Sequence, residues 1–176
     1  MVLILVWYNQ TMIILGIDPG SVIVGYAIIK KDKGCEKCLT VVDFGCIITD
    51  KFLTTGERLK KIHKETVKLI EKYKPNVMSI ENVFFFKNLK TVMPVSQSKG
   101  VILLAAAEKN IKVFEFTPLQ MKMAIAGYGR AEKKQVQKMI EKTLDLSEFD
   151  MKKNNRKKDD AFDALGMAIC ASLKNY

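Results

Sequence analysis

Residues 12–29 read MIILGIDPGSVIVGYAII, and this stretch decides the fold that the sequence predicts. Residues 12–17 are apolar and residues 22–29 are rich in β-branched side chains, so both are expected to be strands. The Asp-Pro-Gly sequence at residues 18–20 is typical of a turn. Because the connection is short, we expect the two strands to run antiparallel, with Asp18 at the end of the first.

The rest of the chain alternates between strand and helix patterns. Residues 39–48 form a third β-branched run, and residues 56–73 carry apolar side chains at helical spacing until Pro75. Further strands are predicted at residues 77–83 and 111–116, and further helices at residues 94–110, 118–125, 131–144 and 158–173. A strand, a helix and a strand in succession form a parallel crossover. The predicted fold class is therefore α/β, with a mixed five-stranded sheet flanked by helices.

Composition and charge favour a single domain that meets a polyanion. The chain has 176 residues, of which 48% are hydrophobic, enough for one core. Its 29 Lys and Arg against 19 Asp and Glu give a net charge of +10. Nucleic acid is the commonest partner of such a basic domain, and the alternative is a basic surface that serves only solubility.

The first eleven residues stand apart from this domain. Their apolar run is too short to span a bilayer and lacks the flanks of a secretory signal. Either they add an edge strand, or translation begins at Met12. Cys35 and Cys38 form a C-x-x-C in an expected hairpin turn, where structural zinc would need two more ligands. No disulfide framework is predicted, so we expect one domain over residues 12–176, in the cytoplasm and away from membranes.

Four acidic residues occur where local rules disfavour them. Asp18 ends an apolar strand, although a plain turn explains it too, and Glu81 lies near the end of another strand. A buried glutamate is costly unless it pairs with a cation, which can be a lysine, an arginine or a metal. Asp160 and Asp163 share one helix face with the apolar Met167. Stabilisation by the helix dipole explains one acid in the first turn of this helix, but it does not explain two acids on the helix face that carries the apolar side chains.

If these four acids lie together at one edge of the sheet, their carboxylates would bind a hard metal cation. Carboxylate oxygens prefer Mg²⁺ or Mn²⁺, and crowded carboxylates without a cation raise one another's pKa. Two such ions about 3.5–4 Å apart form a site for phosphodiester hydrolysis. The basic surface would bring the phosphodiester to that site.

The same residues carry a resemblance to the RuvC family of junction resolvases. ILGIDPGS at residues 14–21 with Gly25-Tyr26 resembles the opening of that family, and IENVF at residues 80–84 with Lys87-Asn88 resembles its second motif. AEKKQV at residues 131–136 and the spaced acids at residues 160–168 resemble two further motifs. Four motifs in order are a specific signal, and they cover residues 12–173. The resemblance implies a ribonuclease H-like fold.

The resemblance also implies roles for individual residues. The four acids would be catalytic metal ligands for two Mg²⁺ ions, with Mn²⁺ as a substitute. Lys122 and Lys133 would neutralise the scissile phosphate, although each would otherwise read as part of a solvated helix face. Phe84 would stack on unpaired bases and Lys87 would contact DNA, whereas the alternative buries Phe84 in the core.

The activity implied is resolution of a four-way DNA junction by paired, symmetric nicks. A homodimer would match the two-fold symmetry of the junction, with the helix at residues 95–110 as its interface, and the RuvA–RuvB branch-migration complex would be a partner. The basic stretch at residues 152–158 would grip a DNA arm or form a solvated loop. Rival readings are a nuclease for RNA or hybrids, a sugar-kinase-like ATPase, and a junction-binding protein without catalysis.

Overall fold

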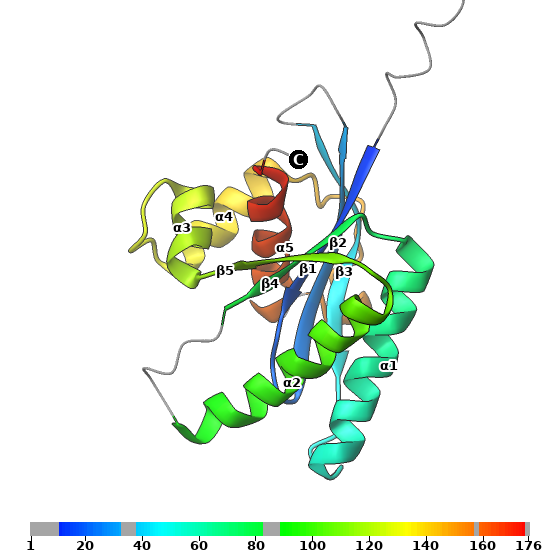
Figure 1. Ribbon diagram of the computed structural model, residues 1–176. Helices are drawn as coiled ribbons and strands as arrows, with labels where there is room; N and C mark the ends of the chain where they lie inside the picture. The colour runs from blue at the N-terminus through cyan, green and yellow to red at the C-terminus, as the bar shows by residue number, and fades with distance from the viewer. Residues whose placement is uncertain (1–10, 33–37, 83–88, 157–158, 175–176) are drawn as a thin grey trace, which may run out of the picture.

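The computed structural model describes residues 11–32, 38–82, 89–156 and 159–174, and these form a three-layer α/β fold (Figure 1). Its strands run in the order β3-β2-β1-β4-β5. The strand bounds are β1 Thr11–Asp18, β2 Ile23–Asp32, β3 Leu39–Ile48, β4 Val77–Glu81 and β5 Lys112–Phe116. β1 pairs antiparallel with β2 and β2 with β3, whereas β1–β4 and β4–β5 are parallel. The predicted mixed sheet of antiparallel meander and parallel crossover is therefore confirmed.

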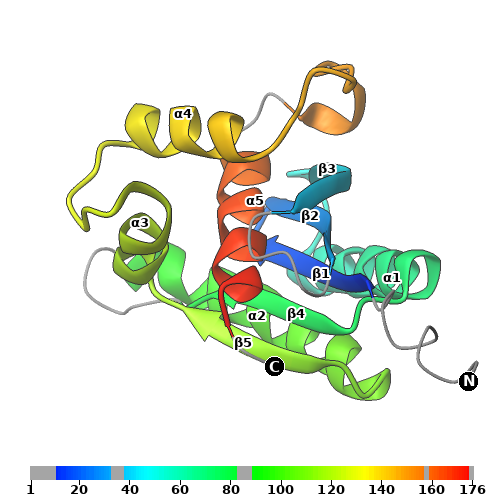
Figure 2. The same ribbon diagram turned by 90° about the horizontal axis from the view of Figure 1, so that it is seen from above.

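Helices cover both faces of this sheet. Their bounds are α1 Thr55–Tyr73, α2 Leu89–Glu108, α3 Pro118–Ala126, α4 Lys133–Thr143 and α5 Asp159–Ser172. One core joins Ile62 of α1 and Ile102 of α2 to the buried side chains on one face of the sheet. The other core joins Leu165 of α5, Ile125 of α3 and Ile140 of α4 to the opposite face. Figure 2 shows α5 lying over the strands, with α3 and α4 beyond it.

The alternation of side chains along β1 assigns each residue to one of these cores. Leu15 and Ile17 are fully buried towards α1 and α2, whereas Ile14 is buried towards α5. Since side chains alternate along a strand, Gly16 and Asp18 face α5 together with Ile14. The end of β1 therefore presents an acidic side chain to the α5 side of the sheet.

Capping residues set where several helices begin. The side chain of Thr54 accepts from the backbone of Glu57 while the Glu57 side chain accepts from Thr54, which closes a capping box before α1. Thr117 and Gln120 form the same box before α3, where Pro118 occupies the first helical position. β5 thus passes directly into α3.

Three details differ from the sequence-based expectations. α2 begins at Leu89 instead of Pro94, so Pro94 lies inside the helix, where its missing N–H removes one backbone hydrogen bond without ending the helix. A short 3-10 helix, η1, occupies Lys153–Asn155 in the stretch before α5. Cys38 is disulfide-bonded, although no disulfide was predicted; Cys35 lies outside the described residues. Among the described helices, none is long and apolar enough to cross a membrane.

Candidate active site

Asp18 and Glu81 come together at the carboxyl ends of two neighbouring parallel strands. Ile17 of β1 is in register with Ile80 of β4, so the residue that follows each of them lies at the same edge of the sheet. The two carboxyls lie close enough for each to shift the pKa of the other. Both side chains are half-buried.

Two glycines allow α5 to lie directly on the sheet beside these acids. A Cβ on Gly16 would stand 2.7 Å from the Ala168 nitrogen, and a Cβ on Gly25 would meet the carbonyl group of Asp160. The backbone of β1 and β2 therefore touches the backbone of α5. This contact brings Asp160 and Asp163, in the first turns of α5, to the end of the sheet that carries Asp18.

The electrostatics of this cluster reflect an excess of negative charge. Burial raises the pKa of Asp18 well above its usual range, and the carboxylates of Glu81, Asp163 and Asp160 raise it further. Burial also raises the pKa of Glu81, against the opposing effects of the Asp18 hydrogen bond and of the Lys133 and Lys99 charges. Carboxyls placed so closely disfavour their own ionised forms unless a cation balances them.

Lys133, at the start of α4, supplies one such cation. Its Nζ lies 3.1 Å from Asp163 Oδ2 and 3.3 Å from Asp159 Oδ2. Burial raises the pKa of Asp163, and the nearby Lys133 works in the opposite direction. Partial burial alone would lower the pKa of Lys133, but the charges of Asp163 and Asp159 outweigh it and raise that pKa. The sequence-predicted Lys133 therefore belongs to the acidic cluster, and Asp159 joins it from outside the predicted set.

The remaining predicted site residues are less directly connected to the acids. Lys122 is half-buried on α3, and no hydrogen bond or ion pair among the described residues joins it to the four acids. Phe84 and Lys87 lie outside the described residues. In the part of the chain that is described, no three His, Cys, Asp or Glu side chains form a ready-made metal-ligand group.

Lys99 of α2 is a member of this region that sequence reasoning missed. Its Nζ lies 3.2 Å from Asn82 Oδ1 and 2.6 Å from Glu115 Oε2, and its side chain is only 12% exposed. Nothing in the local sequence distinguishes Lys99 from the many other lysines. Lys99 lies in this region because α2 packs close to the ends of β4 and β5, which the structure shows and the local sequence does not.

Arg156 differs from the expectation that the basic residues 152–158 grip a DNA arm or form a solvated loop. Its guanidinium donates to Asp43 Oδ1 at 2.7 Å and to the carbonyl oxygens of Phe44 and Asp150 at 3.1 Å each. The group also lies over the rings of Phe44 and Phe149. Arg156 is therefore a buried anchor that ties this stretch to β3, available neither to DNA nor to solvent, whereas Lys152 and Lys153 are exposed as expected.

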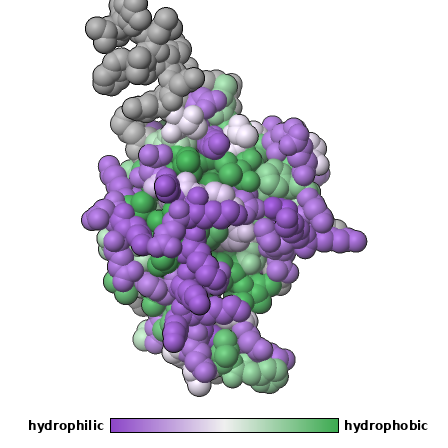
Figure 3. Space-filling model, turned by 90° about the vertical axis from the view of Figure 1, so that its right-hand side faces the viewer, coloured by the Kyte–Doolittle hydropathy of each residue, from purple (hydrophilic) through white to green (hydrophobic). Residues whose placement is uncertain are grey.

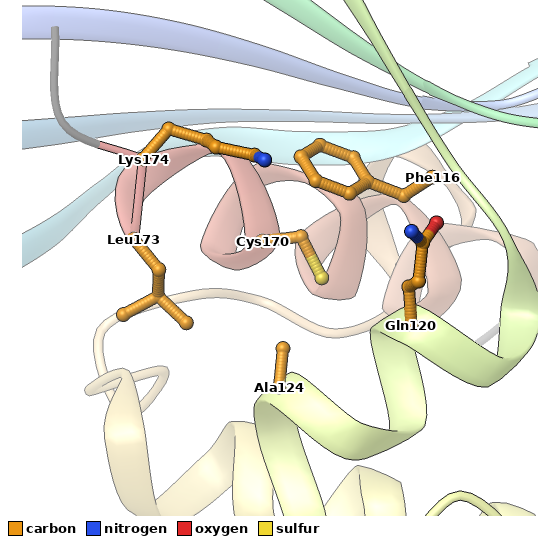
Figure 4. Close-up of a pocket in the computed structure, with 6 residues that line it drawn as sticks. All are labelled: Phe116, Gln120, Ala124, Cys170, Leu173 and Lys174. Carbon is orange, nitrogen blue, oxygen red and sulfur yellow. The ribbon is translucent and has the colours of Figure 1, made fainter.

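Among the described residues, hollows of the surface lie away from the acids. A pocket of about 280 Å³ is lined by Phe116, Cys170 and Lys174 among others, towards the far end of α5 from Asp160 (Figure 4). A groove of about 540 Å³ between α1 and α2 is lined by lysines and by His63, whose Nε2 lies 3.1 Å from Glu108. Hydrophilic side chains cover much of the face that Figure 3 shows, on the side where α1 lies. None of the four acids lines either of these two hollows.

Comparison with known proteins connects this geometry to one family. The family model described as crossover junction endodeoxyribonuclease RuvC matches residues 14–171. A protein of that name from Fusobacterium nucleatum is 50% identical over 158 residues, which are 90% of this chain and 78% of that protein. Its namesake from Halothermothrix orenii is 48% identical over 159 residues, which are 90% of this chain and 91% of that protein.

A solved structure supports the same assignment. The structure of T. thermophilus RuvC in complex with a Holliday junction substrate superposes with a TM-score of 0.79 at 27% sequence identity, covering 92% of this chain and 93% of that one. The predicted ribonuclease H-like fold is thereby confirmed. The matched residues include all four acids of the candidate site. This chain belongs to the RuvC family of crossover junction endodeoxyribonucleases.

Proposed function

We propose that this protein is a metal-dependent endonuclease that resolves Holliday junctions by paired, symmetric nicks, in recombination and repair of DNA. The observation that carries the proposal is the cluster of Asp18, Glu81, Asp160 and Asp163, drawn from β1, β4 and α5 to one edge of the sheet. The family, whose name describes cleavage of crossover junctions, supports the same reaction class. The net charge of +10 suits a polyanionic substrate.

The donor set fits Mg²⁺, with Mn²⁺ as a substitute. Carboxylate oxygens are the ligands that these hard cations prefer. Burial, followed by the charges of neighbouring carboxylates, raises the pKa values of Asp18, Glu81 and Asp163, and a bound cation would offset both effects. In our proposal the four acids hold two ions. Bound ions would supply a hydroxide at neutral pH and stabilise the leaving oxygen.

Basic and aromatic residues around the acids would bind the DNA. Lys133 lies beside Asp163, and its ammonium would neutralise a phosphate that enters the site. Lys122 would contribute a second positive charge from α3. Phe84 would stack on a base unpaired at the crossover, and Lys87 would bind the backbone beside it.

A homodimer would provide two such sites for the two strands of a junction. One face of α2 exposes residues at alternating spacings of four and three, namely Met93, Gln97, Gly100, Leu104 and Ala107. This spacing is typical of one helix packing against another, and a Cβ on Gly100 would meet no atom within 4 Å. We propose this face as the dimer interface. A functional link to a RuvA–RuvB complex and a place in the cytoplasm complete the proposal.

Substrate competition tests the proposal against a general ribonuclease H-like nuclease. The wild-type protein would be given equal amounts of a labelled four-way DNA junction, a linear DNA duplex of the same sequence and an RNA–DNA hybrid, in Mg²⁺. We expect symmetric nicks in the junction alone, with 5′-phosphate and 3′-hydroxyl ends. Equal cleavage of the hybrid or of the linear duplex would contradict junction specificity.

A further inference from the structure

Lys99 is a charged side chain in a nearly closed environment. Only 12% of it is exposed, against 37% for Lys109 in the turn directly after the same helix. Removing an ammonium group from water costs several kcal/mol unless partners replace the lost hydration. Lys99 has two such partners, Glu115 Oε2 at 2.6 Å and Asn82 Oδ1 at 3.2 Å. Its orientation is therefore fixed by those two contacts.

The two partners belong to the strand ends that form the active-site edge of the sheet. Asn82 directly follows Glu81, and its backbone nitrogen donates to the Phe116 carbonyl oxygen at 2.8 Å. Glu115 is in register with Ile80, the residue before Glu81. Lys99 therefore contacts the residue that follows Glu81 at the end of β4 and a residue of the neighbouring strand β5.

We propose that Lys99 is a positioning residue for cleavage, which holds the end of β4 so that Glu81 stays beside Asp18. It acts through Asn82 and Glu115 and does not touch the substrate. The inference rests on the proposed nuclease function. It also connects the active site to α2, because Lys99 directly precedes Gly100, which lies on the helix face proposed as the dimer interface. A shift of α2 on binding a second subunit would therefore be passed through the Lys99 side chain to the end of β4 that carries Glu81.

A mispositioned carboxylate should affect chemistry more than binding. A displacement of about 1 Å in a catalytic group can cost on the order of a hundredfold in rate. Junction affinity depends on many phosphate contacts over a wide surface, so one buried lysine contributes little to it. Metal occupancy depends on ligand geometry, so a displaced Glu81 should also require more Mg²⁺ for half-maximal activity.

The test compares Lys99→Met with Lys109→Met in the full chain. Lys109 lies in the turn directly after α2 and pairs with Glu71 at 2.7 Å, so its variant loses one ion pair far from the acids. Single-turnover cleavage of a four-way junction would be measured across a Mg²⁺ titration, beside junction affinity in EDTA and thermal unfolding. We expect Lys99→Met to cleave about ten- to a hundredfold more slowly with affinity unchanged, and to need more Mg²⁺. Lys99→Arg should recover part of the rate, and Lys109→Met should match the wild type.

Other outcomes would overturn the inference. The inference fails if Lys99→Met cleaves at the wild-type rate with the wild-type Mg²⁺ dependence. It also fails if the slower cleavage is explained by weaker junction binding, or if Lys109→Met is slowed to the same degree. If Lys99→Met fails to fold, Glu115→Gln replaces it, since the Glu115 side chain is 43% exposed. A several-fold slower rate is expected of that variant, and an unchanged rate overturns the inference. Absence of cleavage by the wild type overturns the proposed function as well, whereas equal cleavage by wild type and Lys99→Met overturns this inference alone.

Discussion

The main-chain carbonyl of Asp160 occupies the space in which a Cβ atom on Gly25 would stand. Gly25 lies on β2 beside Asp18, its partner in the antiparallel register with β1. One missing side chain thus lets the start of α5 approach the strand that carries the first acid. The closeness of Asp160 to Asp18 depends on this backbone contact.

Gly25→Ala should slow junction cleavage about tenfold or more, because the added methyl group has no space and must push Asp160 away from the sheet. Overpacking of this kind also lowers the free energy of unfolding by about 1–3 kcal/mol. Cleavage rates and urea unfolding would be measured beside Gly56→Ala, where an added Cβ meets no atom within 4 Å. Equal rates in both variants would show that α5 need not lie so close.

Asp43→Asn should lower the free energy of unfolding at pH 7 by about 3 kcal/mol, because the guanidinium of Arg156 would stay buried without its counter-charge. Both side chains are largely buried, at 13% and 7% exposed. Urea unfolding of wild type and variant would measure the difference. A loss near zero would mean that the Phe44 and Asp150 carbonyls alone satisfy Arg156.

The same pair predicts a pH dependence with a definite sign. Burial alone would raise the pKa of Asp43, but hydrogen bonds from Tyr73 and Arg156 outweigh it and lower that pKa. A carboxyl with a lowered folded-state pKa stabilises the protein above its unfolded value of about 3.9, and this stabilisation disappears as the pH falls through the folded value. The stability gap between wild type and Asp43→Asn should therefore be largest above about pH 5 and narrow towards pH 2. A constant gap would contradict the ion pair.

Lys133→Gln should reduce the cleavage rate about ten- to a hundredfold, since it removes the positive charge 3.1 Å from Asp163. The neighbouring Lys134, which is exposed on the same helix, provides the control. Single-turnover cleavage at saturating protein would separate this effect from weaker binding. Equal losses in Lys133→Gln and Lys134→Gln would reduce both lysines to general DNA contacts.

Leu104→Glu should convert the proposed dimer to a monomer, because it places a charge at the centre of the exposed α2 face. Sedimentation equilibrium would report the mass of each protein. Leu173→Glu is the matched control, since Leu173 is exposed to a similar degree, at 56% against 52%. A dimer that survives Leu104→Glu and dissociates with Leu173→Glu would move the interface to the end of α5.

Much of the fold could be predicted because each element carries its own signal. Apolar runs interrupted by short turns defined β1 and β2, and helical spacing with Pro75 defined α1. Short connections and one crossover predicted the antiparallel and parallel parts of the sheet, whereas the pairing of β1 with β4 was seen only in the structure. The acids stood out because an aspartate or glutamate inside an apolar run opposes the local pattern. Asp18, Glu81, Asp160 and Asp163 were therefore identified, and the structure brings them to one edge of the sheet.

Residues whose roles depend on distant contacts gave no such signal. Lys99 and Arg156 resemble solvated basic residues in sequence, yet both are buried against partners far along the chain. The start of α2 was misplaced because proline is favoured at the first position of a helix, whereas Pro94 lies inside α2. The Asp159 contact with Lys133 arises from the packing of α4 beside α5, which no local pattern encodes.

The four acids are expected to carry out metal-dependent cleavage of junction DNA. The most direct test of this expectation is cleavage of a mobile four-way junction by the wild type and by Glu81→Gln, in Mg²⁺ and in EDTA, with junction binding measured in parallel. Glu108→Gln, an exposed glutamate on α2 paired with His63, serves as the control. We predict paired symmetric nicks by the wild type and Glu108→Gln in Mg²⁺ alone, and none by Glu81→Gln although it still binds. Cleavage that persists in EDTA or in Glu81→Gln would contradict the account.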